Sequence, residues 1–207
     1  MSAEVEALKI GLIGDSTVAD TYGWGPAFAE CVSSRTEVLN RAKNGATLES
    51  LSKALTSLLE EKPAYVLIQF GHNDQKRYGA EEYADKLRSY VERVRRSGGK
   101  AIVVSSVTRR NFDRAGRIDP RKAGLKGTLP EFRLAARKVA AELQVPFLDL
   151  YAISVAHYNK IGPKASAVYD FEPGDTTHFS KRGAAAIAAL IVEELGGISP
   201  ELKGDLK

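Results

Sequence analysis

A serine near the amino terminus and an aspartate–histidine pair near the carboxyl terminus are the residues best suited to chemistry in this 207-residue chain. Ser16 lies in the tetrapeptide GDST at 14–17, directly after an apolar run, and Asp175 and His178 stand three residues apart. A serine hydroxyl becomes a useful nucleophile when an imidazole takes its proton and a carboxylate holds the imidazole in the required tautomer. These three side chains therefore have the types needed for acyl transfer through a covalent serine intermediate.

Each of these fragments also has a purely structural interpretation. A serine after a strand is commonly a turn or N-cap residue, and Asp175 and Ser180 could cap a helix while His178 lies on the surface. The residues around Ser16 form neither the G-x-S-x-G pattern of one class of serine hydrolase nor the G-x-G-x-x-G loop of dinucleotide-binding proteins. Taken separately, the two fragments leave catalysis and helix capping both open.

Two further segments offer hydrogen-bond donors for a developing oxyanion. The segment GHND at 71–74 follows the apolar run 64–70, and the side-chain amide of Asn73 could donate to such an oxyanion. Gly45 ends the segment NRAKNG at 40–45 and could present its backbone N–H at close range. The alternatives are an Asx turn at Asn73 and an ordinary Asn-Gly turn at Gly45.

The elements that must position these groups alternate between strand and helix along the chain. Five short apolar runs have the character of buried strands, and five stretches have helical spacing. The strands are expected at 9–14, 38–39, 64–70, 101–107 and 146–150, and the helices at 26–33, 48–61, 81–96, 129–143 and 181–195. Such alternation predicts a single domain over residues 1–207, an α/β protein in which helices cover both faces of a five-stranded parallel sheet in a three-layer α/β/α sandwich. Functional groups are then expected at the carboxyl ends of the strands.

The four segments, in this order and on these loops, resemble the SGNH (GDSL-like) hydrolase superfamily over residues 9 to about 195. The resemblance implies a flavodoxin-like sheet, with Ser16 as the nucleophile and His178 and Asp175 as its triad partners. It also implies an oxyanion hole formed by the backbone N–H of Ser16, by Gly45 and by Asn73. The first block reads GDST where many members have GDSL.

Five longer segments are similar to the rhamnogalacturonan acetylesterase branch of that superfamily. They are GDSTVAD at 14–20, GWG at 23–25, FGHND at 70–74, VTRR at 107–110 and DTTHF at 175–179. The resemblance implies a serine carbohydrate esterase that removes acetyl groups from acetylated polysaccharide or oligosaccharide, with pectic rhamnogalacturonan as the expected substrate.

Neighbouring branches and one different class of protein are the alternatives. An acetylxylan esterase, a general short-chain acylesterase, a thioesterase or a lipase-like enzyme would share the same catalytic residues. A non-catalytic carbohydrate-binding protein would have no physical need for the serine, aspartate, histidine, glycine and asparagine together. A nucleotide-binding protein of the flavodoxin type would need a phosphate-cradling glycine loop, which the sequence lacks.

Three residues are candidates for substrate contact. Trp24 could stack on a sugar ring, although a lone tryptophan is more often a core residue. His72 could contact substrate or support the oxyanion loop by hydrogen bonding. Arg109 and Arg110 follow the fourth expected strand, and Arg110 in particular could meet a carboxylate of an anionic substrate if the basic loop 109–126 reaches the cleft, although a solvated surface loop is the simpler interpretation.

Charge and hydropathy exclude several classes of protein. The 30 Lys and Arg residues exceed the 26 Asp and Glu residues, and the loop 109–126 alone holds seven bases against two acids. Only Phe112 is aromatic in that loop, whereas nucleic-acid surfaces usually combine bases with several aromatic residues, so we expect no nucleic-acid partner. No apolar run approaches the ~20 residues that span a bilayer, so we expect no membrane-spanning segment.

Cofactor use, compartment and assembly follow from a few residues. Cys31 is the only cysteine, which excludes an intramolecular disulfide but does not fix the compartment. His72, His157 and His178 lack the spacing of a zinc site, and the expected chemistry needs neither a metal nor an organic cofactor. Residues 1–8 lack the basic and apolar regions of a secretory signal, so we expect a cytoplasmic protein or the mature form of an exported one. We expect a monomer.

Overall fold

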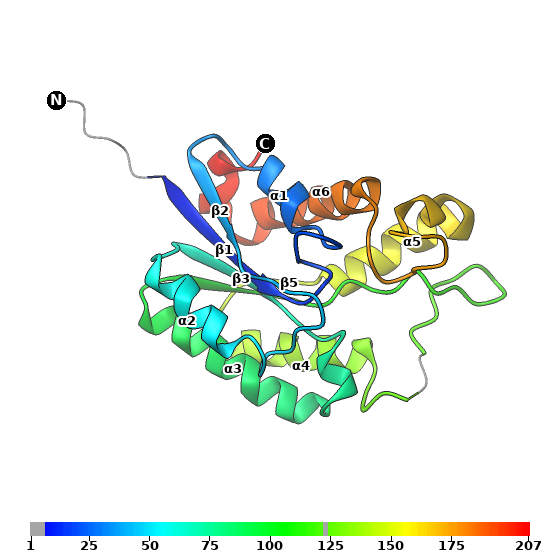
Figure 1. The fold of residues 1–207 in the computed structure, drawn as a ribbon, viewed down its shortest axis with the longest axis horizontal. Helices are drawn as coiled ribbons and strands as arrows, with labels where there is room; N and C mark the ends of the chain where they lie inside the picture. Colours follow the sequence, from blue (N-terminus) through cyan, green and yellow to red (C-terminus); the bar gives the residue numbers. More distant parts are fainter. Residues whose placement is uncertain (1–6, 122–123) are drawn as a thin grey trace.

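The computed structural model describes residues 7–121 and 124–207 and has one five-stranded sheet with helices on both faces (Figure 1). The strands are β1 (Leu8–Gly14), β2 (Thr36–Asn40), β3 (Tyr65–Gln69), β4 (Lys100–Val104) and β5 (Phe147–Leu148). The helices are α1 (Gly25–Glu30), α2 (Ser52–Glu60), α3 (Ala80–Arg96), α4 (Leu129–Glu142), α5 (Leu150–Ser166) and α6 (Lys181–Ile198), with 3₁₀ turns at Asp74–Lys76, Ala167–Tyr169 and Pro200–Asp205. All neighbouring strands are parallel, which confirms the predicted three-layer α/β/α fold.

The strands read as continuous apolar runs because both faces of the sheet are buried. In β3, Val66 and Ile68 belong to the apolar cluster on one face, whereas Tyr65 and Leu67 belong to the cluster on the other. Every residue of β3 is buried, as expected for a central strand whose side chains alternate between two covered faces.

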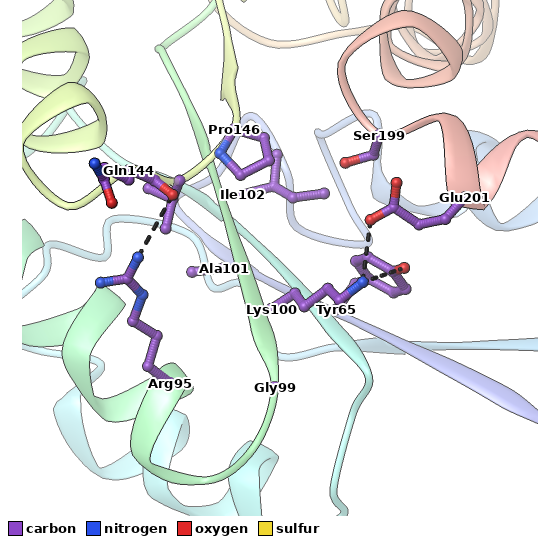
Figure 2. A pocket seen from close by; sticks show the side chains of 11 residues that line it. Tyr65, Arg95, Gly99, Lys100, Ala101, Ile102, Gln144, Pro146, Ser199 and Glu201 are labelled. Atoms are coloured by element: carbon purple, nitrogen blue, oxygen red, sulfur yellow. Dashed lines mark hydrogen bonds and ion pairs between the residues drawn. The ribbon is translucent and has the colours of Figure 1, made fainter.

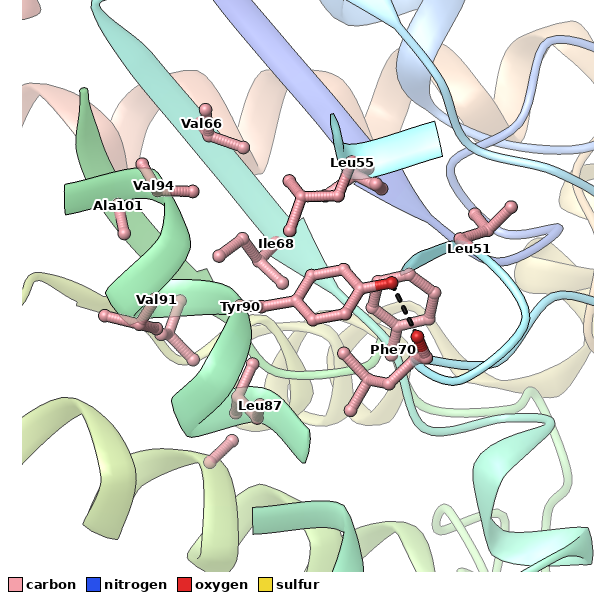
Figure 3. Packing of buried hydrophobic residues seen from close by; sticks show 14 of the residues in the cluster. Leu51, Leu55, Val66, Ile68, Phe70, Leu87, Tyr90, Val91, Val94 and Ala101 are labelled. Atoms are coloured by element: carbon pink, nitrogen blue, oxygen red, sulfur yellow. Dashed lines mark hydrogen bonds between the residues drawn. The ribbon is translucent and has the colours of Figure 1, made fainter. Parts of the chain in front are cut away.

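Helices α2, α3 and α4 cover one face of the sheet, and α1, α5 and α6 cover the other (Figure 1). The buried positions of α3 recur every three to four residues, which gives the helix one apolar stripe toward the sheet. Figure 3 shows Tyr90 of α3 lying beside Phe70, with the ring centroids 5.6 Å apart. Its hydroxyl donates to the backbone oxygen of Leu48 at 2.6 Å, so this polar group is satisfied within the core.

The strand order places a crevice at the carboxyl ends of β1 and β3. The sheet runs β2-β1-β3-β4-β5, so β1 is paired with β2 on one side and with β3 on the other. In open α/β sheets, ligands bind where the strand order reverses in this way. The loops that follow β1 and β3 carry Ser16 and Asn73, which puts both candidate residues at this point.

The largest departure from the expected elements is α5, which the sequence analysis did not predict. The last strand ends at Leu148, and Asp149 then caps α5 by accepting the N–H of Ala152 at 3.2 Å. Gly162 has a positive φ of 77° and is followed by Pro163, so the helix is kinked there. This break, together with buried Ser154 and Tyr158 on the inner face, hides the apolar periodicity on which the prediction relied.

Within the described residues, no helix combines the length and the apolar character needed to cross a bilayer.

Candidate active site

Ser16 stands on a tight turn that only glycine permits at the end of β1. A Cβ on Gly14 would lie 2.5 Å from the backbone oxygen of Gln69 and 2.6 Å from a methyl group of Val18, so no larger residue fits there. The chain then turns so that Ser16 Oγ lies 2.8 Å from Nε2 of His178. The two residues are 162 positions apart in the sequence, and the fold brings them into hydrogen-bonding contact.

Asp175 holds the other side of the His178 ring. Its Oδ2 lies 2.8 Å from Nδ1 of His178, while its Oδ1 accepts the backbone N–H groups of Thr177 and His178 at 3.1 and 3.0 Å. Partial burial raises the pKa of Asp175, but the hydrogen bonds from His178 and Thr177 outweigh it and hold the pKa below its ordinary value. An ionised Asp175 accepts a hydrogen bond from Nδ1–H, which leaves the lone pair of Nε2 facing the Ser16 hydroxyl.

The three candidate oxyanion donors are the backbone N–H groups of Ser16 and Gly45 and the side-chain amide of Asn73. Gly45 adopts a φ of 75°, a left-handed conformation that favours glycine. Among the described residues, neither the backbone N–H of Ser16 nor that of Gly45 has a hydrogen-bond partner. The amide of Asn73 is fixed at both ends, because Nδ2 donates to Ala46 O at 3.1 Å and Oδ1 accepts from Lys76 Nζ at 2.7 Å. One Nδ2–H of Asn73 therefore remains available for a substrate oxygen.

These groups line one pocket of about 320 Å³. The lining residues are Ser16, Tyr22, Asn44, Gly45, His72, Asn73, Lys76, Arg109, Thr177 and His178. Apart from the two histidines, the aromatic ring in this lining is that of Tyr22, whose centroid lies 5.0 Å from that of His178. The pocket therefore offers hydrogen bonds and positive charge to a substrate, and none of its lining residues is a leucine, isoleucine, valine, methionine or phenylalanine that could pack against a long acyl chain.

A buried chain of hydrogen bonds supports the loops that carry the candidate residues Ser16 and Asn73. Oδ1 of Asp15 accepts from the backbone and hydroxyl of Thr17, and its Oδ2 accepts the backbone N–H of His72 at 3.3 Å. Gln69 Nε2 donates to the Thr17 hydroxyl at 2.6 Å, and Gln69 Oε1 accepts from the Trp24 indole at 2.9 Å. Complete burial raises the pKa of Asp15 to about 6, against the opposing effect of its hydrogen bonds from Thr17. This chain ties the loop after β1 to the loop after β3.

A second buried carboxylate joins the two segments that carry the candidate oxyanion donors Gly45 and Asn73. Oδ1 of Asp74 accepts the backbone N–H of Leu48 at 2.9 Å and the hydroxyl of Tyr78. Burial raises the pKa of Asp74. The segment that begins at Gly45 is thereby held against the loop that carries Asn73.

The expected role of Trp24 in sugar stacking needs correction. Its side chain is wholly buried and packs edge-on against Phe28, and its indole N–H donates a hydrogen bond to Gln69. Trp24 is a core residue, and it supports the loops that carry Ser16 and Asn73 through its hydrogen bond to Gln69. His72 does line the pocket, but it is 2% exposed, and its ring contacts the backbone oxygen of Val107 at 2.9 Å, in keeping with the loop-supporting alternative.

The expected contact between Arg110 and substrate also needs correction. The side chain is 1% exposed, and its Nε donates to Asp170 at 2.7 Å. Its Nη2 donates to the backbone oxygens of Asp175 and His178 at 2.8 and 2.6 Å. Arg110 therefore fastens the loop that carries two of the candidate catalytic residues, and it does not face the pocket.

Arg109, the residue before it, lines the pocket in its place. Most of the remaining basic loop is solvent-exposed, including Arg114, Arg117 and Arg121, as the surface-loop interpretation expected. Lys122 of this loop lies outside the described residues. Only the first arginine of the loop reaches the site.

Another cavity, of about 270 Å³, lies at the amino ends of β3 and β4 (Figure 2). Lys100 Nζ lies 3.1 Å from Glu201 Oε1 and 3.4 Å from the hydroxyl of Tyr65. Lys100 is thus paired with Glu201, Arg95 donates to the backbone oxygens of Leu143 and Gln144, and none of the candidate catalytic residues lines the cavity. Over residues 7–121 and 124–207, no three His, Cys, Asp or Glu side chains gather as a metal site would require.

Sequence reasoning missed Tyr22, Lys76 and Gln69 as parts of the site. Lys76 follows Asn73 by three residues within a 3₁₀ turn, a spacing that could have indicated its contact with the Asn73 amide. Gln69 is the polar last residue of an otherwise apolar strand, and such a residue needs a buried partner.

Comparison with known proteins places the chain among ester hydrolases. It matches the GDSL-like Lipase/Acylhydrolase family over residues 12–186. Rhamnogalacturonan acetylesterase RhgT of Bacillus subtilis is 35% identical, with 96% of this chain and 94% of that protein covered. The probable rhamnogalacturonan acetylesterase YesY of the same organism is 28% identical, with 92% of this chain and 94% of that protein covered.

Solved structures share the fold. Protein YXIM of Bacillus subtilis is 25% identical with a TM-score of 0.80, and the match covers 93% of this chain and 58% of that chain. An acetylxylan esterase from Geobacillus stearothermophilus is 18% identical with a TM-score of 0.68, and the match covers 92% of this chain and 96% of that chain.

Proposed function

The chain belongs to the GDSL-like lipase/acylhydrolase family and is an ester hydrolase, and we propose that it removes acetyl groups from acetylated rhamnogalacturonan through Ser16, His178 and Asp175. The observation that carries this proposal is the unbroken line of contacts from Ser16 Oγ through the His178 ring to Asp175, with 2.8 Å at each step. The substrate class rests on the 35% identity to a rhamnogalacturonan acetylesterase over nearly the whole of both chains.

The geometry supports acyl transfer to serine as the first half of the reaction. Ser16 Oγ attacks the acetyl carbonyl carbon while Nε2 of His178 takes the hydroxyl proton. The carbonyl oxygen becomes an oxyanion, which the N–H groups of Ser16 and Gly45 and the Asn73 amide stabilise by hydrogen bonding. Collapse of this tetrahedral intermediate breaks the bond to the sugar oxygen, which receives the proton from the His178 imidazolium.

Water completes the reaction by the same steps. A water molecule attacks the acetyl group on Ser16 as Nε2 of His178 takes its proton, and the same three donors hold the second oxyanion. The intermediate then releases acetate, and the proton on His178 returns to Ser16 Oγ. Throughout, Asp175 stays ionised, orients the ring and stabilises its charged form.

The lining of the pocket supports a short acyl group on a polar substrate. A lipase-like enzyme needs apolar surface for its acyl chain, because a buried methylene gains about 0.8 kcal/mol from such contact. The residues around Ser16 carry hydroxyl, amide, imidazole and cationic groups, and no leucine, isoleucine, valine, methionine or phenylalanine lines the pocket to hold a long chain. An acetyl group has only one methyl to accommodate, and a saccharide can use the polar lining.

The test is acetate release from acetylated rhamnogalacturonan and acetylated xylan in parallel, with Ser16→Ala as the blank and a melting curve to show that the variant is folded. We expect release from the pectic substrate, a loss of at least about 10³-fold in the variant, and a steep fall in turnover between acetyl and butyryl esters of one alcohol. Preference for xylan would overturn the pectic assignment. Full release by Ser16→Ala would overturn the catalytic assignment.

A further inference from the structure

Arg109 presents an uncompensated positive charge to the pocket that holds Ser16. The residue is 5% exposed and lines that pocket. Among residues 7–121 and 124–207, no carboxylate lies within 4.0 Å of its guanidinium, and no hydrogen bond from the group is recorded. The neighbouring Arg110, in contrast, forms an ion pair with Asp170, which neutralises its charge. The two neighbouring arginines therefore have different roles.

The atoms of the Arg109 guanidinium differ in access. Its Nε is sealed from solvent and has no partner. Within residues 7–121 and 124–207 the two terminal nitrogens also have no partner, and they are not sealed from solvent as Nε is, so we infer that they are the part of the group that faces the pocket. A planar guanidinium with two free terminal donors matches the geometry of a carboxylate.

Leaving this cation unpaired is unfavourable for the protein alone. A charge removed from water costs several kcal/mol unless it is paired and hydrogen-bonded. Burial lowers the pKa of Arg109, and the charge of Asp15 offsets only part of this effect. The Asp15 carboxylate accepts its hydrogen bonds from Thr17 and from the backbone of His72, and it forms no ion pair with Arg109.

The rest of the pocket lining also favours an anion. Lys76 is the second cation of the lining, and no Asp or Glu belongs to it. Lys76 donates to the Asn73 amide, whereas the Arg109 guanidinium has no hydrogen-bond partner among the described residues.

We propose that Arg109 binds a carboxylate of the substrate near the acetylated hydroxyl and thereby selects acidic saccharides over neutral ones. The inference rests on the proposed deacetylation of a saccharide and adds a specificity-determining residue to it. Binding of a carboxylate gives the terminal nitrogens of Arg109 their missing partners and neutralises the charge. The competing explanation is that Arg109 stabilises the oxyanion itself, in which case it would act equally on every ester.

The two explanations separate in the ratio of kcat/KM for an acidic substrate to that for a neutral one. We would measure acetylated rhamnogalacturonan oligosaccharides against p-nitrophenyl acetate with the wild type, Arg109→Gln and Arg109→Lys. Loss of a charged hydrogen-bonded contact should lower this ratio by about 10- to 100-fold in Arg109→Gln, with a smaller decrease in Arg109→Lys. Arg114→Gln removes the same charge from an exposed position of the same loop and should leave the ratio unchanged.

Inhibition gives a readout that does not depend on deacetylation of the pectic substrate. Free galacturonate should inhibit hydrolysis of p-nitrophenyl acetate competitively in the wild type, whereas galactose, the neutral sugar, should not. The inhibition constant of galacturonate should rise at least 10-fold in Arg109→Gln. These results would support the carboxylate site even if rhamnogalacturonan proved not to be the substrate.

Other results would overturn the inference. Equal losses on acidic and neutral esters in Arg109→Gln would assign the residue to the oxyanion. Equal inhibition of the wild type by galacturonate and galactose would show that the pocket does not distinguish a carboxylate, and this comparison holds even if the variants fail to fold. Deacetylation of rhamnogalacturonan with an unchanged ratio in Arg109→Gln would remove the inference and leave the proposed function intact.

Discussion

Replacing Arg110 by Gln should destabilise the protein and lower its activity on every ester. The side chain is 1% exposed and donates three hydrogen bonds, to Asp170 and to the backbone oxygens of Asp175 and His178. Glutamine would leave the Asp170 carboxylate without its counter-ion and the two carbonyls without donors. Breaking a buried ion pair by removing one partner costs about 3–5 kcal/mol.

This cost can be converted to a melting temperature. For a chain of this size, 1 kcal/mol corresponds to roughly 2–4 °C, so we expect Tm to fall by about 10 °C. The loop that carries Asp175 and His178 would also lose its fixed position, and a misplacement of about 1 Å at a catalytic group can cost about 100-fold in rate. The loss of kcat should therefore be similar for p-nitrophenyl acetate and for acidic acetylated saccharides.

The assay is a thermal melt together with kinetics on both kinds of ester, with exposed Arg114→Gln as the matched control. A double-mutant cycle with Asp170→Asn adds a second check, because the double variant should lose less stability than the sum of the two single variants. An Arg110→Gln protein with the Tm of the wild type and a raised KM for acidic substrates alone would refute this reasoning. That result would return Arg110 to the role of a direct substrate contact.

Three further predictions concern the catalytic residues and the buried carboxylate beneath them. Asp175→Asn should lower kcat by about 10³- to 10⁴-fold because the amide favours the wrong tautomer of the histidine, and unchanged steady-state kinetics would contradict this. Asn73→Ala should lower kcat by about 10²- to 10³-fold with little change in KM, whereas a change in KM alone would place the amide outside the oxyanion hole. The pKa of Asp15 is raised to about 6 in the folded chain, so the folded state binds its proton more tightly, and this stabilisation is lost as pH rises from about 4 to 6. Urea unfolding of the wild type should therefore lose about 2 kcal/mol relative to Asp15→Asn over that interval, and parallel profiles would contradict the assignment.

Local patterns in the sequence were sufficient to predict the sheet and the placement of the candidate catalytic residues. The apolar runs before Ser16 and before the GHND segment identify two buried strands, and parallel strands bring their following loops to the same edge. The short segment between Asp175 and the last helix lies at that edge too, so the contact between Ser16 and His178 follows from topology.

The roles of individual side chains in the loops could not be predicted in the same way. Arg109 and Arg110 are adjacent, and which of them enters the pocket depends on the path of the irregular segment after β4. A periodic pattern exists in a strand or helix but not in such a segment, so the sequence offers no rule for the direction of either side chain. Helix α5 was missed for a related reason, because Gly162 and Pro163 interrupt it and its buried face carries hydroxyl groups.

The most direct test of the central claim is to identify the residue that becomes covalently modified when the protein is treated with a fluorophosphonate, which traps an activated serine. Peptide mass spectrometry of the wild type should find one adduct, on the peptide that contains Ser16, and His178→Ala should slow its formation by about 10³-fold or more. An adduct on another residue, or an unlabelled Ser16 in a protein that still hydrolyses acetyl esters, would contradict the assignment of Ser16 as the nucleophile.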